Sequence, residues 1–148
     1  MPRFMFDTNI FGKILKMKTP EALLNGGRQY FVTHIQQDEL EGTPKRLRDQ
    51  LLSVFQIIPQ QPIPTETAIF DVSRFGMAKF GDGDLYTTIL QQLDRAKPME
   101  HSNNIKDAII AETAIKNQIV LVTNDKTLAN TVQKLGGQVM SFESTQGI

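Results

Sequence analysis

Apolar and polar positions along the chain alternate between two spacings, one typical of strands and one typical of helices. Short β-branched or aromatic runs predict strands, and apolar residues that recur every three to four positions predict helices. We expect strands at 3–6, 29–34, 119–123 and 138–144, with a further short one at 55–58. We expect helices from residue 10 onward and at 19–24, 35–40, 45–55, 66–78, 85–96, 106–118 and 124–136. Segments 59–66 and 97–104 are expected to be connections.

Alternating strands and helices predict a parallel sheet with helices on both faces. The run at 119–123 is continuously apolar, which is typical of a strand buried on both sides. A chain of 148 residues with 40% hydrophobic residues suits one compact core, so we expect residues 1–148 to form a single domain. Ligands of open parallel α/β sheets bind outside the carboxyl ends of the strands, so polar residues there are the first candidates for a site.

Composition excludes several classes of site. The chain has no cysteine, which rules out disulfides, thiolate zinc sites and cysteine nucleophiles. Sixteen Lys and Arg balance sixteen Asp and Glu, so any nucleic-acid surface must be local. The sequence shows no basic leader and no run near the roughly 18 apolar residues of a membrane helix. We therefore expect a cytoplasmic protein without a membrane segment.

Two carboxylates follow predicted strands. Asp7 comes directly after the strand at 3–6, and Asp125 comes two residues after the strand at 119–123. Because the carboxyl ends of parallel strands meet at one edge, Asp7 and Asp125 can converge there if their strands are near neighbours. Each also has a simpler interpretation, since Asp7 suits a strand-end turn and Asp125 suits a helix cap.

Two further acids can reach the same edge from helices. Glu39 lies about one and a half turns into the helix that leaves the strand at 29–34. Asp107 is expected in the first turn of the helix at 106–118, where the helix dipole favours a negative charge. Three candidate N-caps precede Asp107, namely Ser102, Asn103 and Asn104. The simpler interpretations are a solvated charge for Glu39 and an ordinary N-terminal acid for Asp107.

Four carboxylates at one edge would need a cation, because like charges a few ångströms apart raise one another's pKa. Carboxylate oxygens without His or Cys ligands select Mg²⁺ or Mn²⁺ over zinc. Such ions can activate a water molecule and stabilise a leaving oxygen, which suits hydrolysis of phosphodiester bonds. Asp7, Glu39, Asp107 and Asp125 are therefore interpreted together as a metal-dependent hydrolytic site.

The segments FDTN, THIQQDEL, KDAIIAETA and LVTNDKTL together resemble the PIN domain family of metal-dependent ribonucleases, which includes the VapC-like toxins. The similarity extends from residue 4 to about residue 130, in the family's order and spacing. It implies a PIN-like three-layer α/β/α sandwich with a central parallel sheet of about five strands. It also implies an Mg²⁺- or Mn²⁺-dependent endoribonuclease, with metal-binding and catalytic residues Asp7, Glu39, Asp107 and Asp125.

The resemblance further implies supporting residues and partners. Thr8 and Asn9 would support the first acid, and Thr123 and Asn124 would support the last. RNA would be the substrate, an antitoxin protein would bind the chain if it is a toxin, and the family implies a homodimer. Core packing is the simpler interpretation of a candidate dimer surface formed by Phe70, Phe75 and Phe80.

Three features depart from the family pattern. A helix around 82–97 is additional relative to shorter members and would reshape the substrate entrance. Thr127 and Leu128 stand where PIN nucleases often have an aromatic residue or an aspartate. No strongly basic face is obvious. A candidate phosphate-contacting patch, with a solvated helix face as its simpler interpretation, consists of Lys45, Arg46 and Arg48.

Other polar residues are weaker candidates. Glu112 is an auxiliary candidate that is expected to face outward or to flank the site. His34 and His101 have no partner at a spacing typical of ligands or bases. The stretch GDGD at 81–84 lacks the remaining ligands of an EF-hand loop and is expected to be a turn.

Three other functions compete with the ribonuclease. A haloacid dehalogenase-like phosphatase needs a second aspartate two residues after the first, where this chain has Asn9. A receiver domain needs a phosphoacceptor aspartate after a middle strand, and the strand at 29–34 ends without one. A PIN-like fold without activity could instead serve as an RNA-binding or protein-binding scaffold, although all four acids are present.

Overall fold

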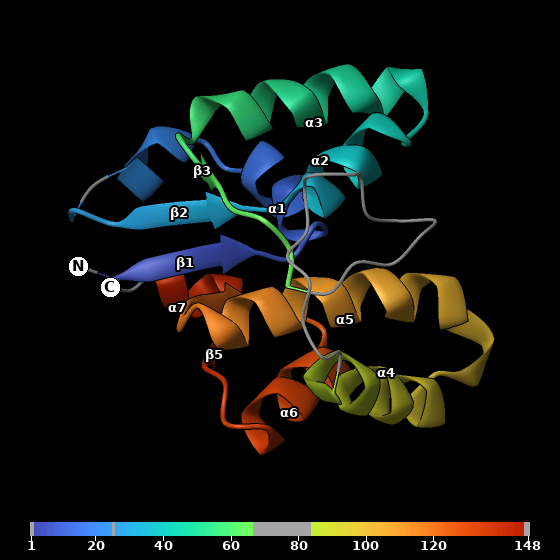
Figure 1. The fold of residues 1–148 in the computed structure, drawn as a ribbon. Helices are drawn as coiled ribbons and strands as arrows, with labels where there is room; N and C mark the ends of the chain where they lie inside the picture. Colours follow the sequence, from blue (N-terminus) through green and yellow to red (C-terminus); the bar gives the residue numbers. More distant parts are fainter. Residues whose placement is uncertain (1, 25, 67–83, 147–148) are drawn as a thin grey trace.

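The computed structural model describes residues 2–24, 26–66 and 84–146 (Figure 1). Its strands are β1 (Arg3–Phe6), β2 (Gln29–Val32), β3 (Gln61–Pro62), β4 (Val120–Val122) and β5 (Val139–Met140). Its α-helices are α1 (Ile10–Leu15), α2 (His34–Glu41), α3 (Lys45–Ile57), α4 (Asp84–Ala96), α5 (His101–Lys116), α6 (Lys126–Lys134) and α7 (Phe142–Gln146). Short 3₁₀ helices, η1 (Pro20–Leu24) and η2 (Pro98–Glu100), complete the described elements.

The strands form a five-stranded parallel sheet in the order β3-β2-β1-β4-β5. Met5 in β1 is in register with Phe31 of β2 on one side and Leu121 of β4 on the other. The chain moves outward from β1 to β3 and then returns to β4 on the opposite side of β1, so the strand order reverses between β1 and β4. Parallel α/β sheets bind their ligands outside the carboxyl ends of the two strands at such a reversal, here β1 and β4. The predicted α/β fold with a parallel sheet of about five strands is confirmed.

Helices cover both faces of the sheet, and the alternation of side chains along β1 separates two cores (Figure 1). Met5 packs in one core with residues of α4, α5 and α6. Phe4 and Phe6 pack in the other core with residues of α1, η1 and α3. The small residues Ala111 and Ala114 are buried, which lets α5 lie close against the sheet. The arrangement is the predicted three-layer α/β/α sandwich.

Several boundaries differ from the sequence prediction. Residues 55–57 continue α3 instead of forming a strand, because the amphipathic pattern of that helix extends through them. The proline-containing pair Gln61–Pro62, expected in a connection, forms the edge strand β3, where a missing N–H is tolerated. The connection expected at 97–104 is shorter, because η2 leads directly into α5 at His101. The last strand ends at Met140 and α7 follows it.

The segment 67–83 lies outside the described residues. Most of the predicted helix at 66–78 and the turn expected at 81–84 fall there, as do Phe70, Phe75 and Phe80. The helix predicted at 85–96 is confirmed as α4. Among the helices that are described, none combines the length and the hydrophobicity needed to cross a membrane.

Candidate acidic active site

Asp7 and Asp125 are connected by Thr123 at the adjacent carboxyl ends of β1 and β4. Asp7 is 5% exposed, and its backbone N–H donates to the carbonyl of Val122 at 2.9 Å. Thr123 Oγ1 donates to Asp7 Oδ2 at 2.9 Å and accepts from the backbone N–H of Asp125 at 3.1 Å. Asp125 Oδ1 also accepts from the backbone N–H of Leu128, so this acid caps α6 as well. One hydroxyl therefore positions both strand-end acids.

Glu39 is held at the same edge through the start of α2. Thr8 Oγ1 donates to Glu39 Oε1 at 2.8 Å. The position of α2 depends on Gln36, whose side chain accepts from the Thr33 N–H in a capping box and donates to the Phe6 carbonyl at 3.3 Å. Gln36 thus anchors α2 to the end of β1. It was not predicted, although Thr followed three residues later by Gln is a known helix-start signal.

Asp107 approaches the other acids from α5. Because α5 begins at His101, Asp107 lies in its second turn, and 102–104 lie inside the helix. The prediction of first-turn placement behind an N-cap in that triplet is therefore wrong; Glu100 occupies the N-cap position. Burial raises the pKa of Asp107 to about 8, and the charges of the three other acids add to the rise. Three carboxylates from distant segments thus lie within electrostatic range of Asp107.

The four acids do not share one protonation preference. Burial raises the pKa of both Asp7 and Glu39, although hydroxyl hydrogen bonds act in the opposite direction. Burial also acts to raise the pKa of Asp125, but hydrogen bonds from Lys97 and from backbone N–H groups leave it lowered. Asp125 is therefore the acid of this group that most favours its charged form.

Lys97 places a positive charge among these acids. Its Nζ lies 2.6 Å from Asp125 Oδ2, and this hydrogen bond raises the pKa of Lys97. Its charge also acts on Asp7 and Asp107. Lys97 is not among the predicted site residues, because it falls in a segment expected to be a connection and no local spacing links it to an acid 28 residues later.

The donor set has the chemistry of a site for Mg²⁺ or Mn²⁺, since all four groups are carboxylates. Within the described ranges, however, no group of three or more His, Cys, Asp or Glu residues is arranged to hold a metal ion. The acids share an electrostatic field, and one of them, Asp125, is engaged by Lys97. The chemistry of the ligands fits, while their present spacing does not form a closed coordination set.

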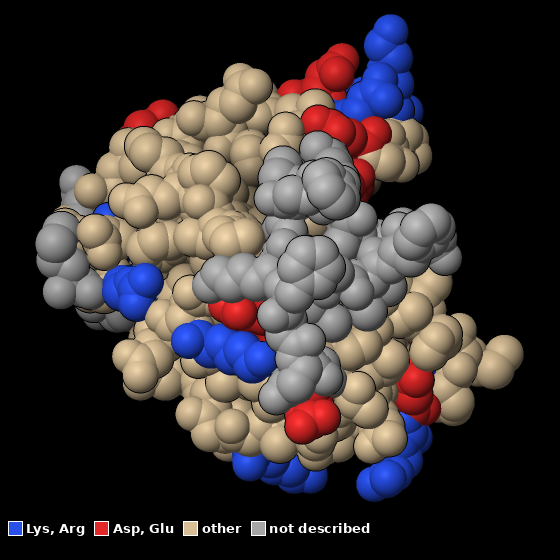
Figure 2. Space-filling model, viewed as in Figure 1, with Lys and Arg blue, Asp and Glu red and all other residues tan. Residues whose placement is uncertain are grey.

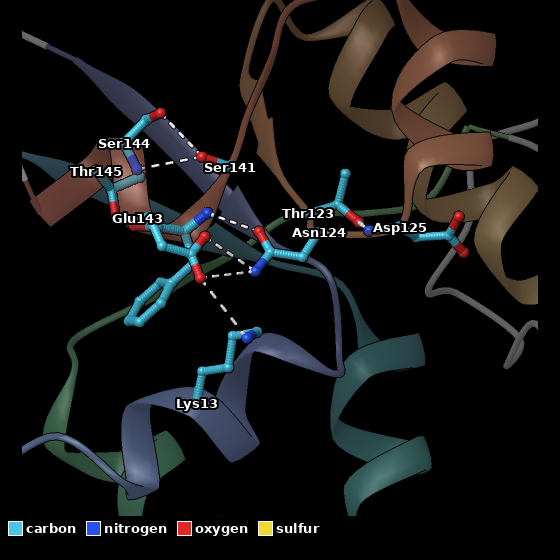
Figure 3. Close-up of polar contacts among 9 residues, drawn as sticks. Lys13, Thr123, Asn124, Asp125, Ser141, Glu143, Ser144 and Thr145 are labelled. Atoms are coloured by element: carbon cyan, nitrogen blue, oxygen red, sulfur yellow. Dashed lines mark hydrogen bonds and ion pairs between the residues drawn. The ribbon is translucent and has the colours of Figure 1, made fainter.

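Three of the predicted supporting residues differ from the prediction. The Thr8 hydroxyl, expected to support Asp7, donates to Glu39 instead. Asn9 is exposed at the N-cap position of α1, and its side chain makes no capping hydrogen bond. The amide of Asn124 donates to both carboxylate oxygens of Glu143, at 3.1 and 3.0 Å, and its carbonyl accepts from the Phe142 N–H (Figure 3). In the same view Asp125 points away from this cluster. Asn124 therefore secures α7.

Glu112 faces the interior, so its predicted outward orientation is wrong. It is fully buried, its Oε2 accepts from the Tyr86 N–H at 3.1 Å, and the same oxygen lies 3.6 Å from Lys116 Nζ. The contact with Tyr86 joins the first turn of α4 to α5, whereas Lys116 lies on α5 itself. All residues of α5 from 108 to 114 are buried, so this helix is covered on more than one side. His101 is part of the opposite end of the same helix pair, where its Nδ1 lies 2.8 Å from Asp94 Oδ2.

Acidic and basic side chains are interspersed over the face shown in Figure 2, with no single basic surface. The predicted patch of Lys45, Arg46 and Arg48 lies at the start of α3, where Lys45 and Arg46 are exposed. A lysine and arginine group of this kind is typical of a solvated helix face as well as of a phosphate contact.

A cavity of about 840 Å³ beside the amino ends of β1 and β2 concentrates positive charge, and we name it the basic cleft. No carboxylate is among its described lining residues, whereas its four cations are Lys13, Lys16, Lys18 and Arg28. A neighbouring cavity of about 590 Å³ shares Lys13 and Lys16 with the basic cleft and reaches Thr8. The two cavities therefore connect positive side chains with the edge that carries the acids. This group of cations is not among the predicted site residues, although three of its members fall within the segment KILKMK.

No protein-family model matches the chain, and no curated protein matches it in sequence. The resemblance to the PIN domain family therefore stays a prediction from the acidic segments of the sequence.

Proposed function

We propose that the protein is a metal-dependent endoribonuclease, with Asp7, Glu39, Asp107 and Asp125 as its metal-binding and catalytic residues. The observation that carries the proposal is geometric: Thr123 holds Asp7 and Asp125 together at the adjacent carboxyl ends of β1 and β4. The charges of Asp7, Asp125 and Glu39 also add to the raised pKa of Asp107. Placing like charges together costs stability, so such groups are found mostly where a function needs them. For this reason strongly perturbed pKa values cluster at functional sites. The edge in question is the one where this fold type binds ligands.

The chain's own residues would keep the carboxylates in place for Mg²⁺ or Mn²⁺. Such an ion, when bound, supplies an activated water and offsets the charge of a phosphodiester. Thr123 fixes Asp7 relative to Asp125, and Thr8 fixes Glu39. Asp107 holds a proton at neutral pH in the metal-free protein, so metal binding would release it. If the protein is a toxin, an antitoxin and a second copy of the chain are further partners under this proposal.

A second candidate function is an inactive PIN-like scaffold that binds RNA or protein. The observation in its favour is that the acids in the described part of the chain are not arranged to hold a metal ion. The salt bridge between Lys97 and Asp125 likewise neutralises part of the acidic site without a metal. The scaffold predicts RNA or protein binding that is independent of Mg²⁺ and Mn²⁺.

Cleavage of a mixed RNA pool separates the two functions. Purified wild-type protein is expected to cleave the pool with Mn²⁺ or Mg²⁺ and to lose this activity with a chelator, with products separated on a denaturing gel. The Asp7→Asn variant, prepared in parallel, controls for contaminating nucleases. Absence of cleavage across both metals, or equal cleavage by Asp7→Asn, would reject the ribonuclease, and metal-independent RNA binding would then favour the scaffold.

The basic cleft is proposed to carry the RNA backbone away from the acids. Replacing Lys16 and Lys18 together by Gln is expected to weaken RNA binding by about tenfold, because two phosphate contacts are lost. The salt dependence should also flatten, with the slope of log affinity against log salt falling by about 1.4. Fluorescence anisotropy with a labelled RNA in chelator measures both effects. The control pair Lys45→Gln and Arg46→Gln should leave the slope unchanged; an equal change there would move the RNA path to the start of α3.

A further inference from the structure

We propose that Lys97 is a phosphate-binding residue of the acidic site and that it competes with a divalent cation for Asp125. This inference rests on the proposed ribonuclease function and extends it to a residue outside the four acids. The Lys97 side chain would then have opposite effects on two ligands, because its positive charge attracts a phosphodiester and repels a metal ion.

Hydrogen bonds hold the backbone of Lys97 in the connection between α4 and α5. Its backbone N–H donates to the Leu93 carbonyl at 2.7 Å, and its own carbonyl accepts from Asn104 Nδ2 at 2.9 Å. Asn104 is 1% exposed and also donates to Asp94 Oδ1 at 3.0 Å. A buried amide therefore joins the end of α4 to the first turn of α5, the helix that carries Asp107. The backbone of Lys97 is fixed relative to the acidic site.

The second support is the placement of the ammonium group. Lys97 Nζ lies 2.6 Å from Asp125 Oδ2, and the two side chains are 29% and 23% exposed. The group is thus partly desolvated, so its interactions are stronger than those of a surface pair, yet solvent and ligands can reach it. Asp125 is held from its other oxygen by the Leu128 N–H, so it stays in place if the lysine turns away. The flexible four-carbon stem lets Nζ move between Asp125 and a ligand.

The third support is the charge that a substrate would meet. A phosphodiester approaching Asp125 carries the same sign of charge as this carboxylate, so binding needs a cation at the carboxyl ends of β1 and β4. The charge of Lys97 acts on Asp7, Asp107 and Asp125. Lys106 is a second cation near the site, and its charge acts on Glu39. Lys97 is therefore a cation shared by Asp7, Asp107 and Asp125.

Two binding measurements on the full chain test the assignment. Lys97→Met keeps most of the stem and removes the charge. Calorimetry with Mn²⁺ alone is expected to show affinity about tenfold higher than wild type, because Asp125 no longer has a competing cation. Anisotropy with a labelled mixed-sequence RNA in chelator is expected to show affinity about tenfold lower. Lys97→Arg should retain RNA binding within about twofold, and Lys134→Met, at the exposed far end of α6, should change neither affinity.

The opposite directions distinguish this role from a purely structural one. A variant with a disturbed site would lose affinity for both ligands, and that outcome overturns the assignment, as does a variant that matches wild type in both measurements. Wild-type protein that binds neither Mn²⁺ nor RNA also overturns it. If both affinities move as expected but wild type cleaves no RNA, the ribonuclease is rejected while Lys97 stands as a phosphate-binding residue.

Discussion

Replacing Asp107 by asparagine should abolish metal-dependent RNA cleavage and, at the same time, make the metal-free protein more stable at pH 8. The loss of cleavage is expected to be at least about a hundredfold, because the site would lose a metal ligand on which the proposed chemistry depends. The gain in stability has a separate cause, which is the cost of ionising this carboxyl in the folded protein.

The sign of the stability effect follows from the two pKa values. The pKa of Asp107 is about 8 in the folded protein, whereas an unfolded Asp titrates near 3.9. Between these values the folded state keeps a proton that the unfolded state has released, so the free energy of unfolding falls as the pH rises toward 8. Asparagine has no proton to lose at this position. The free energy of unfolding of the variant should therefore not fall in this way as the pH rises. At pH 8 we expect it to exceed that of wild type by on the order of 1–3 kcal/mol, after allowance for solvent screening.

Urea unfolding in chelator at pH 5 and pH 8 measures the stability effect, and cleavage of the RNA pool with Mn²⁺ measures the activity. Asp49→Asn removes a carboxylate from an exposed position on α3 and should leave both the activity and the pH dependence unchanged. If Asp107→Asn loses stability with rising pH as steeply as wild type, Asp107 is not the group that ionises in this range. Retained cleavage would remove Asp107 from the proposed catalytic set.

The residues that could be predicted are those whose position follows from the sheet alone. Asp7 and Asp125 follow apolar runs, and any parallel sheet brings strand ends to one edge. Glu39 follows from the helix that leaves the same edge. Their convergence also requires β1 to lie between β2 and β4, and no local pattern specifies that order. The resemblance to a known family supplied that step.

The errors share a different cause, which is contact between residues distant in sequence. Asn124 follows a strand and is a residue type that often supports a neighbouring acid there. Its hydrogen-bond partners instead lie on α7, most of which falls in a segment predicted to be a strand. The start of α5 was misplaced because the Ser-Asn-Asn triplet suits an N-cap, whereas the buried Asn104 serves to hold the Lys97 carbonyl. Lys97 can be recognised as a site residue only from its contact with Asp125, which is distant in sequence. Local propensity predicts elements and cannot predict these pairs.

Removing the buried side chain of Glu112 should cost substantial stability. In Glu112→Ala, the Tyr86 N–H loses its acceptor and a cavity opens between α4 and α5, where Glu112 is 0% exposed. Lost buried hydrogen bonds and charge partners typically cost about 2–4 kcal/mol together. We expect the free energy of unfolding in urea to fall by about that amount.

Two matched variants separate the causes of this loss. Glu112→Gln keeps an acceptor for the Tyr86 N–H and the same volume, so it should cost about 1 kcal/mol or less. Lys116→Met removes only the ion pair; Lys116 is 31% exposed, but it leaves the 0% exposed carboxylate of Glu112 without its cation, so we expect a cost of about 1–3 kcal/mol. If Glu112→Ala were no more costly than Glu112→Gln, the bond to the first turn of α4 would not be what holds this helix.

The helix α4 ends at Ala96, directly before Lys97. If Glu112→Ala loosens α4, it should also weaken RNA binding, whereas Glu112→Gln should not.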